Sequence, residues 1–121
     1  MQQVQLVVAS DFLRSDVAGQ IDFDLSKQLL RDLGRACARH PGHHMLVDVR
    51  ETRGFLSAEE IYCLVEVLEE VGLGEDCKLA ILNRPKDDFD RAKLLEMCAK
   101  KRGLRVAAFR DFEAAFEWIR Q

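Results

Sequence analysis

A carboxylate and a guanidinium at the end of one apolar segment are the first side chains here that could do chemistry. Asp48 lies within the apolar run 45–49, and Arg50 follows it closely. Open α/β sheets bind ligands at the carboxyl ends of their strands, so Asp48 and Arg50 are candidates for contact with a ligand or partner. The alternative is structural: Asp48 accepts hydrogen bonds from the next loop, or pairs with Arg50 or Arg53. The sequence favours this structural role.

Three histidines lie around a proline-glycine turn, where they could hold a metal. His40, His43 and His44 flank residues 41–42, and converging imidazoles bind zinc or nickel. However, neighbouring His43 and His44 would point to opposite faces of a strand, and the turn has no carboxylate or thiol at ligand spacing. We expect a solvated turn with no metal.

The cysteines are widely spaced and contain no C-x-x-C pair, which a zinc site or a thioredoxin-like motif would normally have. Most of them stand among apolar residues. We therefore expect free, buried, reduced thiols in a reducing cytosol, with a disulfide or redox role as the alternative. The four are Cys37, Cys63, Cys77 and Cys98.

The recurrent motifs of catalysis are missing from the sequence. It has no Gly-x-Gly-x-x-Gly or Walker-type phosphate loop and no Gly-x-Ser-x-Gly nucleophile elbow. An enzyme built on Asp48, Arg50 and a histidine would lack motif-level spacing. We expect a protein that is not an enzyme, with no catalytic residues and no cofactor.

Apolar periodicity and capping residues predict the elements that position these side chains. Ser57 and Glu60 have the S-x-x-E spacing of a capping box, which begins a helix at Ser57. Turn chemistry at residues 10–11 predicts an opening hairpin, Gly19 ends its second strand, and residues 51–56 are expected to be a loop. The predicted strands are 4–8, 12–18, 45–49, 78–82 and 104–109, and the helix caps are Asp22 or Asp24, Ser57, Asp87 or Asp88, and Asp111.

The order of these elements predicts the architecture. Strands that alternate with helices pair in parallel through right-handed crossovers, whereas the hairpin adds one antiparallel edge strand. We therefore expect an α/β fold with one mixed sheet of about five strands and four helices.

Composition limits the classes of protein. A chain of 121 residues makes a single domain, residues 1–121. A net charge of -3 argues against a nucleic-acid partner. The sequence has no apolar run long enough to span a membrane and no signal-peptide pattern at its start. We expect a cytoplasmic protein.

Two surface features suggest contacts. A basic stretch at residues 93–105 suits a helix carboxyl end and could also meet an anionic partner. Trp118 falls away from the apolar side of the last helix, where it could anchor a dimer or a partner.

Several phrases in this order resemble the STAS domain superfamily, and specifically its SpoIIAA-like branch. The hairpin ends in GQID at 19–22, and the next strand reads LVDVR at 46–50. KLAIL at 78–82 and KRG at 101–103 follow, and VAAFRDFEAAFEWI at 106–119 matches the branch's closing strand and acidic-aromatic helix. The resemblance covers nearly the whole chain and implies a SpoIIAA-like fold.

The resemblance also implies a function without catalysis. Anti-sigma-factor antagonists of this superfamily bind a partner kinase and are switched by phosphorylation of a serine at the start of the helix after the third strand. Ser57 stands at the matching place, so it is a candidate phosphoacceptor as well as a helix cap. A phosphate there would meet the positive end of the helix dipole.

We therefore expect a non-catalytic regulatory or protein-interaction module that binds a protein partner or forms a homodimer. The alternative, implied by lipid-transfer relatives of the superfamily, is a domain that binds a small apolar or anionic ligand or a lipid in an apolar pocket between sheet and helices.

Overall fold

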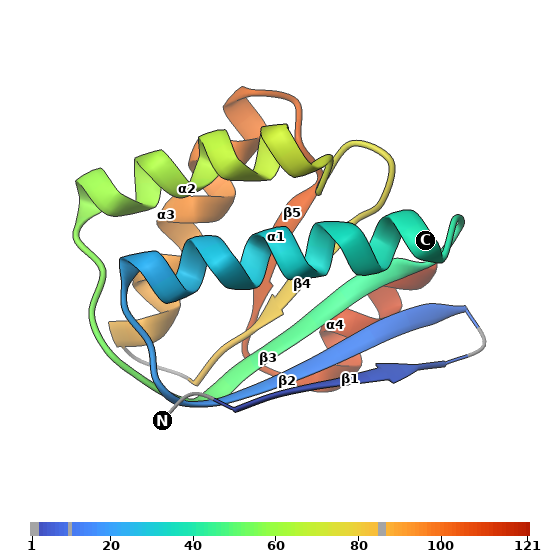
Figure 1. The fold of residues 1–121 in the computed structure, drawn as a ribbon, viewed down its shortest axis with the longest axis horizontal. Helices are drawn as coiled ribbons and strands as arrows, with labels where there is room; N and C mark the ends of the chain where they lie inside the picture. The colour runs from blue at the N-terminus through green and yellow to red at the C-terminus, as the bar shows by residue number, and fades with distance from the viewer. Residues whose placement is uncertain (1–2, 10, 85–86) are drawn as a thin grey trace.

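A computed structural model describes residues 3–9, 11–84 and 87–121. Within them a five-stranded sheet is packed between helices (Figure 1). The strands are β1 (Gln3–Val8), β2 (Phe12–Gln20), β3 (His44–Arg53), β4 (Leu79–Leu82) and β5 (Val106–Phe109), and the helices are α1 (Phe23–Arg39), α2 (Ala58–Val71), α3 (Asp87–Lys101) and α4 (Phe112–Arg120).

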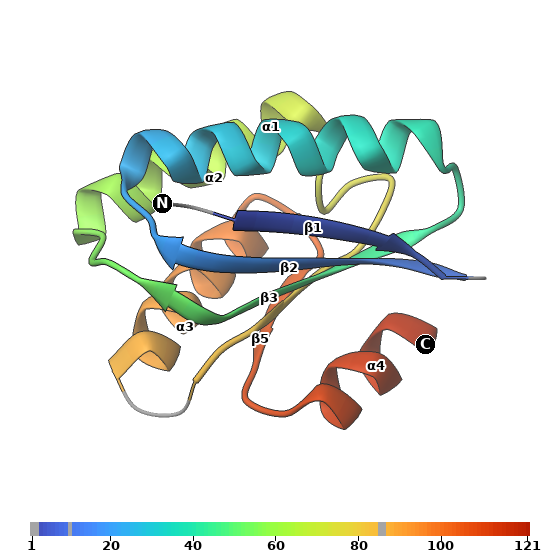
Figure 2. The same cartoon turned by 60° about the horizontal axis from the view of Figure 1, so that its bottom comes forward.

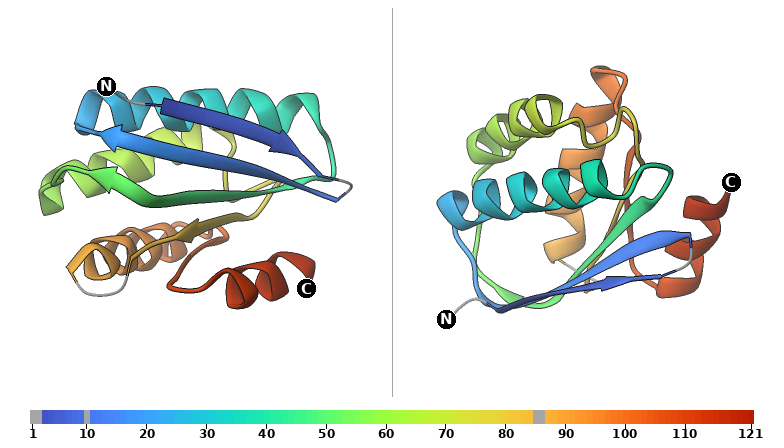
Figure 3. Two further views of the ribbon diagram at one scale, coloured as in Figure 1. Left: turned by 90° about the horizontal axis from the view of Figure 1, so that it is seen from below. Right: turned by 45° about the vertical axis from the view of Figure 1, so that its right-hand side comes forward.

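The strands lie side by side in their chain order, β1-β2-β3-β4-β5. β1 and β2 pair antiparallel and the other neighbours pair parallel. The expected mixed α/β sheet with four helices is therefore confirmed. Because every parallel connection advances in one direction with the same hand, α1, α2 and α3 cover one face of the sheet, and α4 lies alone on the other (Figures 2 and 3).

Two apolar clusters form the core, one on each face of the sheet. The larger joins strand residues such as Leu13 and Met45 to the apolar faces of α1, α2 and α3. The smaller joins Leu46, Ala80 and Leu82 to Ala115 and Ile119 of α4. Successive side chains of a strand point to opposite faces, so Met45 and Leu46 pack into different clusters. Both faces of β3 and β4 are thus covered, and their sequences read as continuous apolar runs.

The predicted caps at Asp22, Ser57 and Asp111 are present, each accepting a hydrogen bond from a backbone N–H of the first turn. Gly72 ends α2 in the left-handed conformation, with φ 80°. The last strand begins at Val106, two residues later than expected. The turn residue Ser10 and the side chains of Asp87 and Asp88, the predicted caps of α3, lie outside what the structure describes.

The predicted loop at 51–56 is wrong in its first half, because β3 continues to Arg53. Glu51, Thr52 and Arg53 pair with residues 18–20 of β2 beyond an irregularity in register after Asp16. Gly19 does not end β2 but pairs with Thr52. Pairing with a neighbouring strand therefore overrides the polar character of this segment.

β1 is an edge strand whose side chains are exposed, Val4, Leu6 and Val8 among them. Its backbone is paired on one side only, which is the geometry that accepts a further strand. The homodimer stays a prediction. Among the described residues, no helix combines the length and the apolar character that crossing a membrane requires.

Candidate functional site

An apolar cavity lies at the carboxyl ends of the parallel strands, between the sheet and the helices. Its volume is about 590 Å³, within the usual range for small-molecule sites. α1, α3, β3 and β4 provide most of its wall, including Leu29, Leu33, Ile81 and Leu95. The same residues belong to the main core cluster. The expected ligand pocket between sheet and helices therefore has a matching cavity, whereas its ligand stays a prediction.

Three polar side chains in the cavity wall hydrogen-bond to backbone carbonyls, and the charged residues Asp90 and Arg91 also line it. The hydroxyl of Ser26 donates to the Asp22 carbonyl at 2.7 Å, and that of Thr52 donates to the Val49 carbonyl at 2.7 Å. The Asn83 amide donates to the Ile81 carbonyl at 2.9 Å. Because these donors are in use, the wall behaves as an apolar surface, and an apolar group is the natural occupant.

The mouth of the cavity contains an exposed aromatic ring and a cation. Phe55 is 71% exposed, and the Arg91 guanidinium stands over its ring at 4.3 Å from the centroid. Beside them the backbone of Gly54 approaches Ile21 so closely that an added Cβ would lie 2.0 Å from the Ile21 carbonyl oxygen. The mouth thus contains a close contact between two backbone segments, at Gly54 and Ile21. Next to it lies the Phe55–Arg91 pair, whose aromatic ring is exposed to solvent.

Ser57 begins α2 immediately after this mouth. Its hydroxyl accepts a hydrogen bond from the Glu60 N–H at 3.1 Å, while the Glu60 carboxylate accepts one from the Ser57 N–H at 2.8 Å. Tyr62, one turn further along α2, is 54% exposed. Phe55, Ser57 and Tyr62 are called the Ser57 surface below. The capping role of Ser57 is present, and its role as phosphoacceptor stays a prediction.

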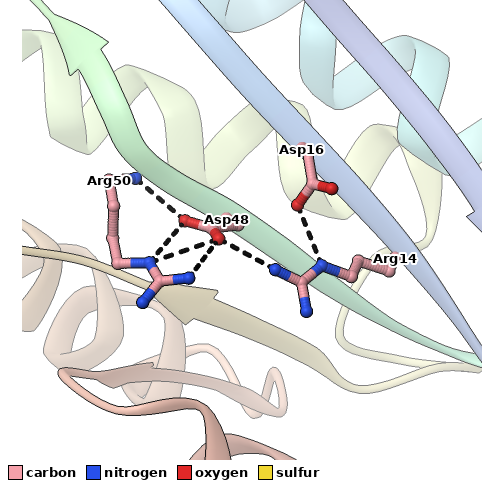
Figure 4. A network of polar contacts seen from close by, with 4 residues as sticks. All are labelled: Arg14, Asp16, Asp48 and Arg50. Atoms are coloured by element: carbon pink, nitrogen blue, oxygen red, sulfur yellow. Dashed lines mark hydrogen bonds and ion pairs between the residues drawn. The ribbon is translucent and has the colours of Figure 1, made fainter.

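Asp48 lies on the opposite face of the sheet, at the centre of an ion network (Figure 4). It is 8% exposed. Its carboxylate accepts hydrogen bonds from the Arg50 side chain at 2.8 Å, the Arg50 backbone N–H at 3.0 Å and Arg14 at 3.1 Å. Arg14 also donates to Asp16 at 2.9 Å. The structural role that the sequence favoured for Asp48 is therefore present.

This network changes the acidity of both partners. Burial raises the pKa of Asp48, but the hydrogen bonds from Arg50 and the charges of Arg50 and Arg14 outweigh it, so the pKa falls below its usual value. The hydrogen bond to Asp48 in turn raises the pKa of Arg50. Asp48 is thus an anion at neutral pH, held by two cations. Asp48 also borders a hollow of about 510 Å³ with Arg14, Asp16 and Glu51.

Trp118 packs within the protein on α4. Its ring lies 5.6 Å from that of Phe109, and the Lys78 ammonium stands 5.4 Å above it. The Trp118 carbonyl accepts a hydrogen bond from Lys78 at 2.9 Å. The ring is partly exposed, and its contact with a partner stays a prediction.

The basic stretch at 93–105 is largely paired. Lys93 and Lys100 both reach Glu96, Arg102 pairs with Glu69, and Arg105 donates to the Glu75 carbonyl at 2.7 Å. This neutralisation favours the interpretation as a solvated helix end.

One histidine makes a contact that the sequence did not reveal. His44 accepts the Lys78 backbone N–H at 2.9 Å through Nδ1. Across the described part of the chain, no three His, Cys, Asp or Glu residues are grouped as a metal site would need. All four thiols are free. The expectation that they are buried is wrong for Cys63, which is exposed on α2.

The predicted site residues do not form a single site. Asp48 and Arg50 contact each other on the α4 face of the sheet. Ser57 begins α2 on the opposite face, which α1, α2 and α3 cover, and Trp118 lies on α4. Sequence reasoning missed Arg14, which joins the network because β2 is the parallel neighbour of β3. It also missed Phe55 and Arg91. The available signal was an aromatic residue within a polar connection directly before a helix cap.

Comparison with known proteins supports the fold. No sequence model of a known family and no curated protein matches the chain. An uncharacterised protein of the DUF3478 family with a SpoIIAA-like fold, from Shewanella loihica PV-4, has 18% sequence identity and a TM-score of 0.61, over 98% of this chain and 93% of that one. An anti-sigma factor antagonist from Mycobacterium paratuberculosis has 14% identity and a TM-score of 0.64, over 100% and 96% of the two chains. The chain therefore has the α/β fold expected from the resemblance, a SpoIIAA-like fold.

Proposed function

We propose that this chain is a non-catalytic regulatory module of the cytoplasm that acts by binding a protein partner through the Ser57 surface. The observation that carries the proposal is the exposure of Phe55 and Tyr62, 71% and 54%, which flank Ser57 in the sequence. Exposed aromatic residues are the usual anchors of protein interfaces. The similarity of fold to an anti-sigma factor antagonist supports a partner of the anti-sigma factor class.

The charge around this surface defines the partner further. The exposed positions of α2 include Glu59, Glu66, Glu69 and Glu70. Glu69 is paired with Arg102, whereas the outer face of the helix as a whole is acidic. A partner that complements it would present basic residues around an apolar hollow that accepts Phe55 and Tyr62.

The same surface suits regulation by phosphate. Ser57 is the N-cap, so phosphate oxygens on its hydroxyl would accept the N–H groups of the first turn that the hydroxyl now accepts. The added charge would lie beside Glu59 and Glu60 and make an acidic surface more acidic. Basic residues of the partner would attract this charge, but burying a phosphate between the apolar anchors Phe55 and Tyr62 carries a desolvation cost that outweighs the attraction, so we expect the partner to bind more weakly.

The test measures the affinity of the purified chain for the anti-sigma factors of its source organism. We expect one of them to bind, and the double variant Phe55→Ser, Tyr62→Ser to lose at least tenfold in affinity. Met97→Ser is the matched control, because Met97 is 50% exposed but lies on α3. Ser57→Asp should weaken the complex and Ser57→Ala should preserve it. The absence of binding by any anti-sigma factor, or equal binding by the double variant, would refute the proposal.

A second candidate function rests on the cavity of about 590 Å³. Its apolar wall, with Arg91 at the mouth, suits a small amphipathic molecule that has an apolar body and an acidic group. This ligand class differs from a protein partner, and the two functions are separable by mutation.

The test is native mass spectrometry of the freshly purified chain, followed by titration with oleate. We expect a bound apolar molecule, or binding of one equivalent of oleate. Leu94→Trp, which places bulk in the cavity wall, should abolish it. The control Met97→Trp introduces the same side chain on the exposed side of α3 and should have no effect. Failure of oleate to bind an empty chain would remove this candidate.

A further inference from the structure

The edge strand β1 turns the backbone groups of three residues away from the sheet. Where the hairpin closes, the Ala9 N–H donates to the Phe12 carbonyl at 2.9 Å, so these two residues are a hydrogen-bonded pair. Hydrogen-bonded and non-hydrogen-bonded pairs alternate along an antiparallel ladder. The register therefore directs the N–H and C=O groups of Val4, Leu6 and Val8 outward, where no other strand of the described residues lies.

The side chains of the same three residues are exposed and apolar. Val4, Leu6 and Val8 alternate along β1, so they share one face of the sheet, and they are 40–51% exposed. On β2 their neighbours on that face include Leu13 and Val17, which are buried in the larger core cluster. Val4, Leu6 and Val8 are called the β1 stripe below. The stripe thus extends the apolar surface of the core to the edge of the sheet.

The two edges of the sheet differ in how they meet an incoming strand. At β5, the Ala108 N–H donates to the Glu96 carboxylate of α3 at 3.4 Å. Glu96 is 7% exposed and is paired with Lys93 and Lys100. β1 instead has the sequence QVQLVV, without a charge or a proline, and its register with β2 is regular. Charges, prolines and bulges are the usual devices that keep an edge from pairing, so β1 is built to accept a strand.

The β1 stripe is complementary to itself. Its order, Val-x-Leu-x-Val, is the same in both directions about Leu6. In an antiparallel pair centred on this residue, Leu6 would face Leu6 of the partner subunit, and Val4 would face Val8 of the partner subunit. Their outward N–H and C=O groups would complete hydrogen-bonded pairs. A second copy always presents like charges, and β1 has no charge to repel its own copy.

We propose that β1 pairs antiparallel with β1 of a second copy of this chain, which joins the two sheets into one and covers both stripes. The contact is isologous, because one twofold axis relates the two strands. It goes beyond the Ser57 surface, since β1 and α2 lie apart in the fold (Figure 1). The dimer would therefore leave the Ser57 surface of each chain accessible.

The first test is sedimentation equilibrium of the purified chain across micromolar concentrations, the range expected for an interface of modest size. We expect a dimer for the wild type and a monomer for Leu6→Lys, which places two ammonium groups opposite each other. Met97→Lys is the matched control, because Met97 is similarly exposed but lies on α3, and it should remain a dimer. A monomeric wild type, or a Leu6→Lys chain that still dimerises, would overturn the proposal.

The second test checks the register by mixing charges. Leu6→Lys and Leu6→Glu should each be monomeric alone, and an equimolar mixture should form a heterodimer, because residue 6 faces residue 6 of the partner subunit in the proposed pair. Native mass spectrometry separates the heterodimer from the two monomers. A mixture that stays monomeric would reject the symmetric pairing.

A third readout uses the unmutated chain, so it does not depend on the folding of a variant. Amide hydrogen exchange, followed by NMR at concentrations where the dimer forms, should show slow exchange at Val4, Leu6 and Val8. The Val7 N–H is the internal reference, because it faces β2 in the monomer as well. Rapid exchange at Leu6 beside slow exchange at Val7 would show an open edge and contradict the proposal.

Discussion

The two ends of the parallel sheet differ in how they are closed. At the amino end Lys78 is 8% exposed and donates to the carbonyls of Trp118 and Gln121 at 2.9 and 2.7 Å, which fixes the end of α4. At the carboxyl end the helices stand apart around the cavity. One end of the sheet is therefore anchored to α4, and the other is open around the cavity.

Gly54→Ala should disturb the open end. The new Cβ would meet the Ile21 carbonyl oxygen, and φ at this position is 141°, so we expect a loss of about 3 kcal/mol in the free energy of unfolding. Gly42 at the anchored end has φ 86° and no atom within 4 Å of its ideal Cβ. Gly42→Ala should therefore cost only about 1 kcal/mol, the backbone part alone. Chemical denaturation of both variants measures the two losses in the free energy of unfolding. Equal losses would show that the contact of the new Cβ with the Ile21 carbonyl does not contribute to the cost.

Asp48→Asn tests the ion network on the α4 face. Removing a carboxylate shared by two arginines should cost about 2 kcal/mol at pH 7. The folded-state pKa is lowered from 3.8. The stabilisation is thus complete above that value and is lost as the pH falls through the lower folded-state pKa, so the difference between variant and wild type should shrink there.

The control for this network is Asp16→Asn, because the Asp16 side chain is 42% exposed and has one arginine contact. It should cost under about 1 kcal/mol. Urea unfolding at several pH values measures both variants. A pH-independent penalty for Asp48→Asn would argue against the ionised carboxylate as its source.

His44→Asn should give the smallest effect, confined to the anchored end. Burial and the charges of Lys78, Arg105 and His43 lower the pKa of His44 from 6.5. The neutral ring stabilises the fold above that value, and this contribution is lost as the pH falls through the lower folded-state pKa. The carboxamide oxygen of the new side chain would still accept the Lys78 N–H without titrating. Wild type and variant should therefore match at pH 8, and wild type alone should weaken as the pH falls below 6.5. Parallel thermal melts across this range would contradict the assignment.

The sequence predicted the elements well because their signals are local. Asp22, Ser57 and Asp111 begin helices as expected, and the hairpin followed by parallel pairing was correct. The end of β3 was not predictable, because the pairing of Glu51–Arg53 depends on the register with β2. The composition of a short polar segment does not indicate whether another strand will pair with it.

The candidate site was harder to predict than the fold. The stripe of Leu29 and Leu33 on α1 was expected to be core, and the same stripe lines the cavity. The wall of a cavity and a filled core show the same apolar periodicity in the sequence. They differ only in the distance between the helices and strands that face each other.

The chain order of the strands has a consequence for biosynthesis. Since every strand from β2 to β5 pairs with the strand made before it, the sheet can grow by one strand as each β-α unit leaves the ribosome. No strand has to wait for a later segment to fill a gap beside it. The nascent chain therefore exposes one unfinished sheet edge at a time, and the helix that covers each addition follows it directly in synthesis.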